Sequence, residues 1–282
     1  MSQKSYDGSP TLYLVPTPIG NMDDITIRAI NTLKNVEAIF SEDTRVTGIL
    51  LKYFDIKKKL ISNYEYNESK NLDLAIKYLE EGKDIALVSD AGSPIISDPG
   101  FEMAKYVISK GYNVVALPGA TAFVPALSTS SINPMPFLFY GFLNSKESKR
   151  KKELLELKDI KYTIIFYEAS HRILETIDNI RKIMGDRYIS ISREISKKYE
   201  QVYRGTCSEV LDMLQELKGE FVIVVQYQKS ESVDNTLSIK NHVEKYILLG
   251  YKTMDAIKAV SKDRNIPKSE VYSEYHREDL WS

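Results

Sequence analysis

The sequence has few of the residues that cross-link proteins or hold zinc. Its 282 residues include one cysteine and three histidines. The single Cys207 excludes an intramolecular disulfide and fits a reducing cytosol, so we expect a cytoplasmic protein. Because the histidines and the cysteine are spread along the chain, the sequence shows no structural zinc site, and we expect no bound metal.

Long hydrophobic runs and an excess of charge are also lacking. No segment approaches the roughly 20 apolar residues of a membrane helix. The first ten residues contain no hydrophobic segment of a secretory signal, and we expect residues 1–10 to form a disordered lead-in. The hydrophobic content of 43% and charged content of 27% are those of a soluble globular protein. Since the net charge is −1, any nucleic-acid contact depends on local basic patches.

The glycine-rich motifs of common nucleotide-binding proteins are missing as well. Where such a motif would follow the first predicted strand, the chain reads Pro16-Thr-Pro-Ile-Gly-Asn21, and it contains no GxxxxGK[ST] loop elsewhere. Two prolines make this loop stiff, so it suits a pocket wall better than a cradle for a pyrophosphate. This argues against NAD and ATP as ligands.

The first half of the chain alternates between short apolar runs and helical stripes. The predicted strands are residues 12–15, 36–40, 60–61, 85–88 and 114–117. Strands that alternate with helices of about ten to fifteen residues predict βαβ units. We therefore expect an N-terminal α/β domain over residues 11–121 with a mostly parallel five-stranded sheet.

The second half predicts another α/β domain, over residues 122–228. Its predicted strands are residues 137–140, 163–167, 188–191, 201–203 and 221–225. No helix separates the third of these from the fourth, so this sheet is expected to be mixed. Residues 229–236 are predicted to form a linker. Residues 237–282 are predicted to form a helical extension that is interrupted at Gly250 and Pro267.

Several residues predict where helices begin. Asp98 is expected to cap the helix after the fourth strand, with Pro99 at its first position. Thr44 and Ser170 are expected to cap two further helices. Thr206 and Glu209 have the spacing of a capping box.

The most informative stretch runs from Ile85 to Gly100, where an apolar strand leads into a loop of small and turn-forming residues and then a helix. Open α/β sheets bind ligands at the carboxyl ends of their strands. The loop Pro16–Asn21 and the turn Leu117–Ala122 fall on the same edge, and Asp90 can accept hydrogen bonds there. The alternative is an ordinary βα turn.

Four charged segments could also carry chemistry, and each has a plainer interpretation. Glu42–Arg45 could be a helix-capping cluster. Phe166–Arg172 combines aromatic, acidic and basic groups, although a histidine at a helix start is usually a surface residue. Arg193–Glu200 could be a solvated loop. Lys146–Lys152 is the strongest basic cluster, and it is either a solvated helix face or a contact for phosphates.

These motifs, in this order and spacing, resemble the tetrapyrrole methylase family, and within it the branch of ribosomal RNA methyltransferases. The resemblance covers residues 11–228, and the helical extension is similar to one found in part of the family. The motifs that carry it are Val15–Asn21, Glu42–Arg45, Leu87–Pro94, Ser97–Gly100, Pro118-Gly119, Phe166–Glu168, His171-Arg172, Arg193-Glu194 and Ser196-Lys197.

The resemblance implies two α/β lobes with S-adenosylmethionine in the cleft between them, and a homodimer. It implies methyl transfer to the ribose 2′-hydroxyl of one cytidine in the decoding region of 16S rRNA, in the small ribosomal subunit. The chain departs from the family pattern at Ala120, at Tyr64 and over Tyr140–Asn144. These departures put details on the substrate side in doubt.

The resemblance also assigns site residues by motif position. For the cofactor these are Pro18, Asp90, Ala91, Gly92, Pro94, Ile95, Thr121, Ala122, Phe166, Tyr167 and Ile223. For RNA they are Asn21, Arg45, Lys149, Arg150, Arg172, Arg193 and Lys197. A ribose hydroxyl is a poor nucleophile and needs a base or a hydrogen-bond acceptor, for which Glu168, His171 and Glu194 are unranked candidates.

Two other functions remain open at this stage. A tetrapyrrole C-methyltransferase would need a wide apolar cleft, and the charged segments Glu168–Arg172 and Arg193–Lys197 fit RNA better. A ribosome-binding module without catalysis would not need the intact loops Asp90–Pro94 and Pro16–Asn21.

Overall fold

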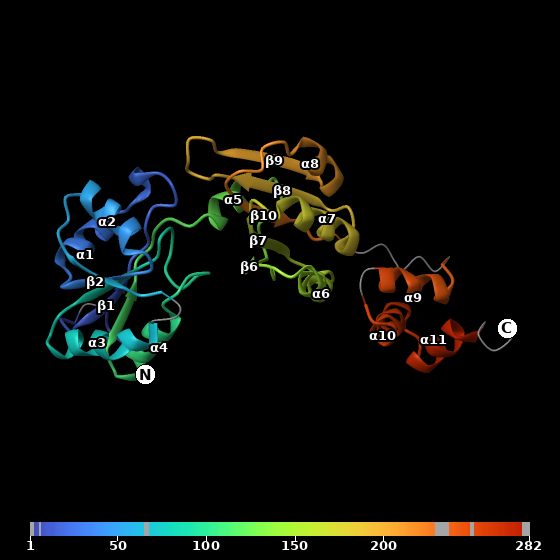
Figure 1. Cartoon of the computed structure of the whole chain (residues 1–282), viewed down its shortest axis with the longest axis horizontal. Coiled ribbons are helices and arrows are strands. Elements are labelled where there is room, and N and C mark those ends of the chain that lie inside the picture. Colours follow the sequence, from blue (N-terminus) through green and yellow to red (C-terminus); the bar gives the residue numbers. More distant parts are fainter. Residues whose placement is uncertain (1–2, 6, 65–67, 229–236, 249–250, 278–282) are drawn as a thin grey trace. The chain divides into compact units, whose positions relative to one another are not determined.

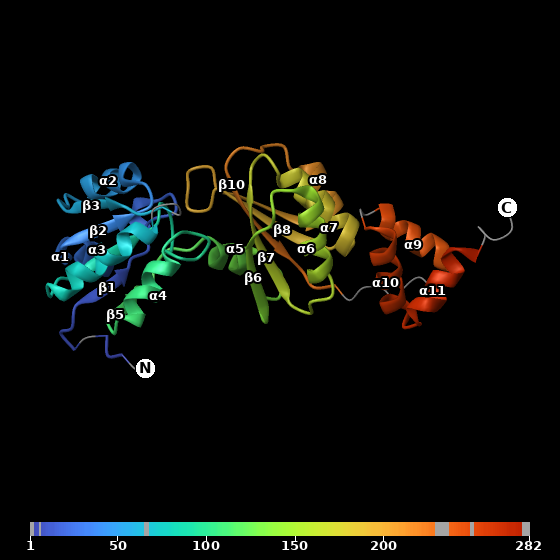
Figure 2. The same ribbon diagram turned by 60° about the horizontal axis from the view of Figure 1, so that its bottom comes forward.

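The computed structural model describes residues 3–5, 7–64, 68–228, 237–248 and 251–277, and the expected linker 229–236 lies outside them (Figures 1 and 2). The chain forms two compact units. The first comprises residues 1–125 together with residues 194–201, and the second comprises residues 126–193 and 202–282. Each unit has its own sheet and its own hydrophobic core.

The first unit contains a wholly parallel sheet of five strands in the order β3-β2-β4-β1-β5. The strands are β1 (Thr11–Leu14), β2 (Ala38–Ser41), β3 (Lys59–Ser62), β4 (Ile85–Val88) and β5 (Asn113–Ala116). Every residue of β2 and β4 is buried, as expected for central strands that are covered on both faces. The predicted sheet is confirmed, with strand ends displaced by one or two residues.

Helices cover both faces of this sheet. They are α1 (Ile27–Asn35), α2 (Thr44–Tyr53), α3 (Glu68–Glu80) and α4 (Phe101–Ser109), with a short η1 (Met22–Asp24) before α1. Leu33 of α1 and Leu51 of α2 belong to one core, and Leu79 of α3 and Met103 of α4 belong to the other. The unit therefore has three layers, with α1 and α2 on one face and α3 and α4 on the opposite face (Figure 2).

The neighbouring strands β1 and β4 send the chain to opposite faces. β1 leads to α1, and β4 leads to α4. The sheet therefore has a topological switch point between these two strands, where open α/β sheets form a crevice for ligands.

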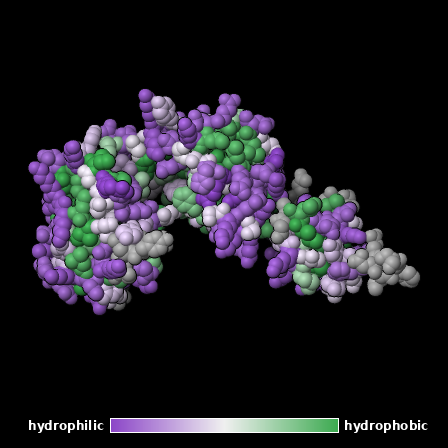
Figure 3. Space-filling view, in the orientation of Figure 1, coloured by the Kyte–Doolittle hydropathy of each residue, from purple (hydrophilic) through white to green (hydrophobic). Residues whose placement is uncertain are grey.

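Hydrophobic residues also gather on the surface over α1 and α2 (Figure 3). Ile27 is 79% exposed, Ile49 is 65% exposed and Tyr53 is 63% exposed. In α2, Ile49 and Tyr53 lie four residues apart, so they share one side of the helix. We call Ile27, Ile49 and Tyr53 the apolar stripe of the first unit.

The start of the chain lies beside β5 in the part that the structure describes. The side-chain amide of Gln3 donates to the carbonyl of Val114 at 2.7 Å, and its oxygen accepts from the amide of Val114 at 3.2 Å. The side chain of Asn113 donates to the carbonyl of Lys4 at 3.2 Å.

The second unit contains a mixed sheet in the order β6-β7-β10-β8-β9. The strands are β6 (Phe137–Phe142), β7 (Thr163–Ala169), β8 (Tyr188–Arg193), β9 (Gln201–Thr206) and β10 (Glu220–Val225). β6 and β7 are parallel, whereas β10 is antiparallel to β7 and β8. The expectation of a mixed sheet is confirmed. The helices near this sheet are α5 (Phe123–Thr129), α6 (Glu147–Leu157), α7 (Ile173–Met184) and α8 (Cys207–Met213).

Three of the predicted helix caps were wrong. Asp43, not Thr44, caps α2, and its carboxylate accepts from the amide of Arg45 at 2.8 Å. The N-cap of α4 is Gly100, at a φ of 121°, and not Asp98. Only glycine fits there, since a Cβ would lie 2.4 Å from Cδ2 of Leu87. α7 begins after Arg172 and not Ser170, since a turn closed by the bond from Arg172 N to Ala169 O comes first.

The capping box at α8 is confirmed. The hydroxyl of Thr206 accepts from the amide of Glu209 at 3.3 Å, and the carboxylate of Glu209 accepts from the amide of Thr206 at 2.7 Å.

The helical extension is confirmed over its described residues as α9 (Ile239–Leu248), α10 (Thr253–Arg264) and α11 (Lys268–Tyr275). These helices have a small core of their own, in which Val243, Ile257 and Val271 are fully buried. Pro267 is the N-cap of α11, as its position suggested, whereas Gly250 lies outside the described residues. Over the described ranges, no helix is both long enough and apolar enough to cross a membrane.

Candidate functional site

The loops that follow β1 and β4 are joined at the switch point by a pair of backbone hydrogen bonds. The amide of Thr17 donates to the carbonyl of Gly92 at 2.9 Å, and the amide of Gly92 donates to the carbonyl of Thr17 at 3.0 Å. The hydroxyl of Thr17 also donates to the carbonyl of Ser89 at 3.1 Å. Gly92 has a φ of +80°, which a residue with a Cβ adopts only at a cost. We call this pair of bonds the Thr17–Gly92 bridge.

The turn after β5 lies against the same two loops. A Cβ at Gly119 would lie 2.5 Å from Cβ of Pro16, so only glycine permits this approach. The hydroxyl of Ser93 donates to the carbonyl of Ala120 at 3.4 Å. The three loops that the sequence placed at one edge of the sheet therefore lie together, and they carry the cofactor residues expected in the first unit. These are Pro18, Asp90, Ala91, Gly92, Pro94, Ile95, Thr121 and Ala122.

Three carboxyl groups lie near this edge, and each has a raised pKa. Burial and the carboxylate of Asp90 raise the pKa of Glu42. Burial raises the pKa of Asp90, although its carboxylate accepts from the amide of Asp43 at 3.0 Å. Burial, with the charges of Glu42 and Asp90, raises the pKa of Asp98 to about 7. A nearby positive charge favours the ionised form of a carboxyl group, so a ligand with positive charge suits this edge.

The sequence interpretation missed Asp98 as a site residue. Asp98 was assigned to a helix cap, and Glu42 was noted only as part of a charged segment. Both residues follow a strand at its carboxyl end, which is the signal that could have found them.

The loop between β4 and α4 stores backbone strain. Ile95 has a φ of 77° and Ser97 has a φ of 68°, both in the left-handed region. Such a conformation costs about 1–2 kcal/mol for a residue with a side chain. Two strained residues in one loop are typical of a segment that the surrounding structure holds in place for a function.

A second group of predicted residues meets in the first unit through the loop 194–201. The side chain of Lys197 passes over Gly20, where a Cβ would lie 2.3 Å from Cγ of Lys197. The ammonium of Lys197 binds Oε1 of Glu194 at 2.9 Å. The hydroxyl of Ser196 donates to the carboxylate of Asp24. The structure thus brings Glu194 and Lys197 to the loop that ends in Asn21, whose side chain accepts from the amide of Asp23.

Glu168 lies in the second unit, where its carboxylate is fully engaged. It is 2% exposed. Oε1 accepts from the amide of Ala169 and from Nη2 of Arg172, both at 2.7 Å, and Oε2 accepts from the hydroxyl of Thr176 at 2.6 Å. Three donors leave little capacity for a proton from a substrate, so this arrangement positions Arg172. The neighbouring His171 is exposed.

The other cofactor residues expected in the second unit lie on two strands. Phe166 and Ile223 are fully buried in the core, so their side chains present no surface. Tyr167 is partly buried, and its ring meets those of Phe139 and Phe142 edge-on at 4.9 Å and 5.6 Å.

The basic residues that the resemblance assigned to RNA have different environments. Arg150 is fully buried, pairs with Glu175 at 2.5 Å and donates to the carbonyls of Asn144 and Ser145, so it braces the start of α6 and cannot reach a phosphate. Lys149 is exposed.

Arg193 and Arg45 likewise differ in their exposure to solvent. Arg193 is mostly buried and donates to the carbonyl of Lys218 at 2.6 Å. Arg45 is exposed and pairs with Asp43 at 2.5 Å.

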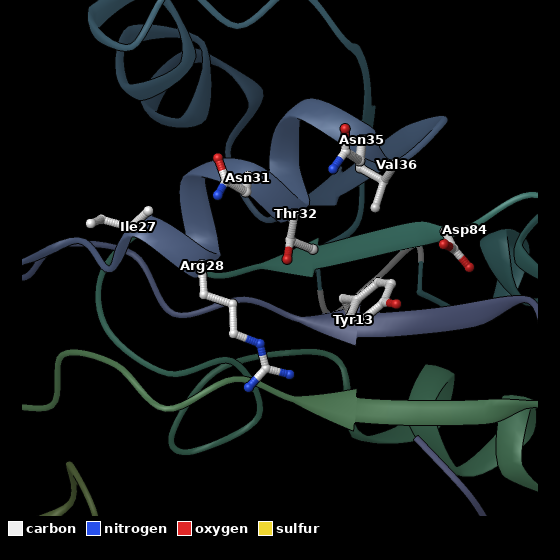
Figure 4. Close-up of a pocket in the computed structure, with 8 residues that line it drawn as sticks. All are labelled: Tyr13, Ile27, Arg28, Asn31, Thr32, Asn35, Val36 and Asp84. Atoms are coloured by element: carbon white, nitrogen blue, oxygen red, sulfur yellow. The ribbon is translucent and has the colours of Figure 1, made fainter. Parts of the chain in front are cut away.

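A groove along α1 is a separate feature of the first unit (Figure 4). Its lining residues are Tyr13, Ile27, Arg28, Asn31, Thr32, Asn35, Val36 and Asp84. None of these eight is among the residues that the sequence assigned to a site. Within the described ranges, no group of three His, Cys, Asp or Glu side chains could hold a metal ion.

Comparison with a family model and comparison with individual proteins give results that agree. Residues 11–211 match the family model described as Tetrapyrrole (Corrin/Porphyrin) Methylases. The Ribosomal RNA small subunit methyltransferase I of Bacillus subtilis is 50% identical in an alignment of 285 positions that covers 97% of this chain and 98% of that protein. The protein of the same name from Halalkalibacterium halodurans is 45% identical in an alignment of 288 positions that covers 98% of this chain and 99% of that protein.

Solved structures resemble the fold at low sequence identity. Uroporphyrin-III-C-methyltransferase from Thermus thermophilus has a TM-score of 0.55 at 18% identity, covering 77% of this chain and 94% of that chain. The methyltransferase CobJ has a TM-score of 0.58 at 16% identity, covering 78% of this chain and 95% of that chain. A further structure of the Thermus thermophilus enzyme is a complex with S-adenosyl homocysteine, at a TM-score of 0.56, 15% identity and coverage of 77% and 97%.

The raised pKa of Asp98 predicts a pH-dependent stability. Between the ordinary pKa of about 4 and about 7, the folded state binds more protons than the unfolded state, so the free energy of unfolding falls as pH rises. We therefore expect Asp98→Asn to unfold at higher urea concentration than the unsubstituted chain at about pH 8. The difference should vanish near pH 4.

The control is Glu80→Gln, at an exposed position at the end of α3. It should show no comparable gain at high pH. Equal stability of Asp98→Asn and the unsubstituted chain at pH 8 would contradict this interpretation of the acidic edge.

Proposed function

This chain belongs to the tetrapyrrole methylase family, whose methyl donor is S-adenosylmethionine, and we propose that its acceptor is the ribose 2′-hydroxyl of a cytidine in the decoding region of 16S rRNA. The observation that carries the proposal is the identity of 45–50% with relatives named for the small ribosomal subunit, over at least 97% of the chain. The tetrapyrrole enzymes share only the fold with this chain, at 18% identity or less.

The carboxyl edge of the first sheet fits this cofactor. A sulfonium carries a positive charge, which favours the ionised forms of Glu42, Asp90 and Asp98. The Thr17–Gly92 bridge gives a stiff wall of backbone, and small residues let a ligand approach it. Pro18, Asp90–Ile95 and Thr121-Ala122 would hold the cofactor there.

The cofactor supplies an already activated methyl group, so the chain has to align the acceptor and take its proton. Of the three candidate bases, Glu168 is buried and occupied by three donors. Glu194 is less buried, and its carboxylate pairs with Lys197, which lies beside the loop after β1. We therefore place proton acceptance at Glu194, with Lys197 holding its carboxylate in position.

Further parts of the proposal concern assembly and location. The apolar stripe of the first unit, Ile27 with Ile49 and Tyr53, supports association with a second copy of the chain. A substrate in the ribosome places the reaction in the cytoplasm.

Methyl transfer from labelled S-adenosylmethionine tests the acceptor directly. The substrates are small ribosomal subunits and naked 16S rRNA from a strain that lacks the gene for this protein. We expect label in a 2′-O-methylated cytidine of the decoding region, identified by nuclease digestion and mass spectrometry.

Other outcomes distinguish the remaining functions. Cofactor binding without transfer to either RNA substrate would reject the proposed acceptor, and transfer to uroporphyrinogen would then establish the tetrapyrrole alternative. Absence of cofactor binding would leave only a ribosome-binding module.

The contact of Lys197 with Gly20 predicts the effect of one added methyl group. Gly20→Ala places a Cβ where Cγ of Lys197 now lies, so Lys197 and its partner Glu194 have to move. Because a displacement of about 1 Å near reacting groups can cost about 100-fold, we expect the rate of methyl transfer to fall about ten- to hundredfold. Affinity for the cofactor, measured by calorimetry, should change little.

Gly82→Ala is the matched control for this substitution. Gly82 also has a positive φ, +78°, but no atom lies within 4 Å of a Cβ built there. A rate for Gly20→Ala equal to that of Gly82→Ala would show that the position of Lys197 does not matter for transfer.

A further inference from the structure

The helical extension contacts the end of α6 and the lysine that follows it. The ammonium of Lys158, just after α6, donates to the hydroxyl of Tyr246 in α9 at 2.8 Å and lies 3.7 Å from the carboxylate of Asp263 in α10. The carbonyl of the same lysine accepts from Nη2 of Arg187 at 2.5 Å, and Arg187 is 1% exposed. Leu155 of α6 also packs against the core of the extension.

The second and third helices of the extension are joined by a short, well-defined turn. Only residues 265–267 separate α10 from α11, and Asn265 adopts the left-handed conformation that ends α10. The hydroxyl of Ser261 donates to the carbonyl of Ile266 at 2.6 Å. Two helices joined by a turn of three or four residues are a common way to present a helix to nucleic acid.

Two of the five acidic side chains of the extension bond to tyrosines within it, whereas Asp255, Glu270 and Glu274 are exposed. Residues 237–277 contain eight Lys and Arg and five Asp and Glu, a net charge of +3 in a chain whose net charge is −1. Glu244 accepts from the hydroxyl of Tyr275 at 2.7 Å, and Asp263 accepts from the hydroxyl of Tyr246. These internal bonds occupy two of the five carboxylates, which raises the share of basic groups at the surface.

Three exposed lysines and one exposed aromatic ring lie on α10 and α11. Lys258 and Lys262 lie one turn apart on α10, away from the buried Ala256, Ile257 and Val260. Lys268 begins α11, and Tyr272, one turn later, is 47% exposed with its ring 4.5 Å from that of His276. None of the three lysines forms an ion pair with another residue of the described ranges. We call Lys258, Lys262, Lys268 and Tyr272 the tail face.

We propose that the tail face binds unpaired RNA, with the three lysines at phosphates and Tyr272 stacked on a base. The inference rests on the proposed function, because it gives that same RNA substrate a second contact, on the helical extension. Lysine contacts to phosphates carry no sequence information and add affinity. An exposed aromatic ring suits an unstacked base in a loop, since the major groove of an RNA helix is too narrow for side chains to read.

Salt dependence of RNA binding separates this proposal from a general effect of charge. The probe is in vitro transcribed 16S rRNA, bound by the full-length chain between about 50 and 200 mM salt. Each phosphate contact to single-stranded nucleic acid contributes a slope of about −0.7 to the plot of log K against log salt. The triple variant K258Q/K262Q/K268Q should therefore bind more weakly, with a slope shallower by about 2.

A matched control removes the same charge elsewhere. K34Q/K52Q/K57Q changes three exposed lysines of the first unit, and its slope should stay close to that of the unsubstituted chain. Tyr272→Leu should weaken binding without changing the slope, and Tyr272→Phe should bind as the unsubstituted chain does. Calorimetry with S-adenosylmethionine should give the same affinity for all variants, which shows that they are folded.

Each outcome decides one of the two proposals. Unchanged affinity and slope for the triple variant, while the unsubstituted chain methylates the RNA, would overturn the tail face and leave the proposed function intact. A lower slope without methyl transfer by any form would support the tail face and reject the proposed acceptor. An unsubstituted chain that binds no RNA would overturn the tail face. So would a triple variant that binds naked rRNA normally but assembled subunits more weakly, because that result would indicate contact with a ribosomal protein.

Discussion

The Thr17–Gly92 bridge is the constraint on which the candidate site depends. It joins the loops of two neighbouring strands whose chains leave for opposite faces of the sheet, so it fixes the backbone at the switch point. The positive φ of Gly92 makes the bridge possible, and the absence of a Cβ at Gly119 lets the third loop approach Pro16. Asp90 and Asp98 belong to the loop that this bridge fixes. The backbone of that loop therefore sets how deeply their carboxyl groups are buried.

Charged residues in the second unit mainly hold its helices, strands and loops in place. Glu168 holds Arg172 and Thr176, Arg150 secures the loop before α6, and Arg187 binds the carbonyl ends of α6 and α7. A buried charge is costly unless it is paired or hydrogen-bonded, and each of these groups has at least one such partner. The motif residues that remain accessible, such as Lys149 and His171, are therefore the ones whose side chains a substrate could reach in this unit.

Periodicity in the sequence predicted both sheets, because buried strands such as Ile85–Val88 are continuous apolar runs and need no distant information. The caps at Asp98 and Ser170 were wrong, since local propensity cannot register that Leu87 crowds Gly100 or that an extra turn precedes α7. The three loops of the carboxyl edge could be placed from strand order. The environments of Arg150 and Glu168 could not, because they depend on partners such as Glu175 and Thr176 from another element.

Calorimetric titration with S-adenosylmethionine of the unsubstituted chain and of Gly92→Ala tests the central claim most directly. The claim predicts that the unsubstituted chain binds the cofactor and that the variant, folded by circular dichroism, binds it about tenfold more weakly. A Cβ at Gly92 would make only ordinary van der Waals contacts. The loss of cofactor affinity would instead come from the positive φ, which costs about 1–2 kcal/mol for alanine and which the chain relieves by moving the bridge. Equal affinity of the two proteins, or no binding by either, would contradict a cofactor site built on the Thr17–Gly92 bridge.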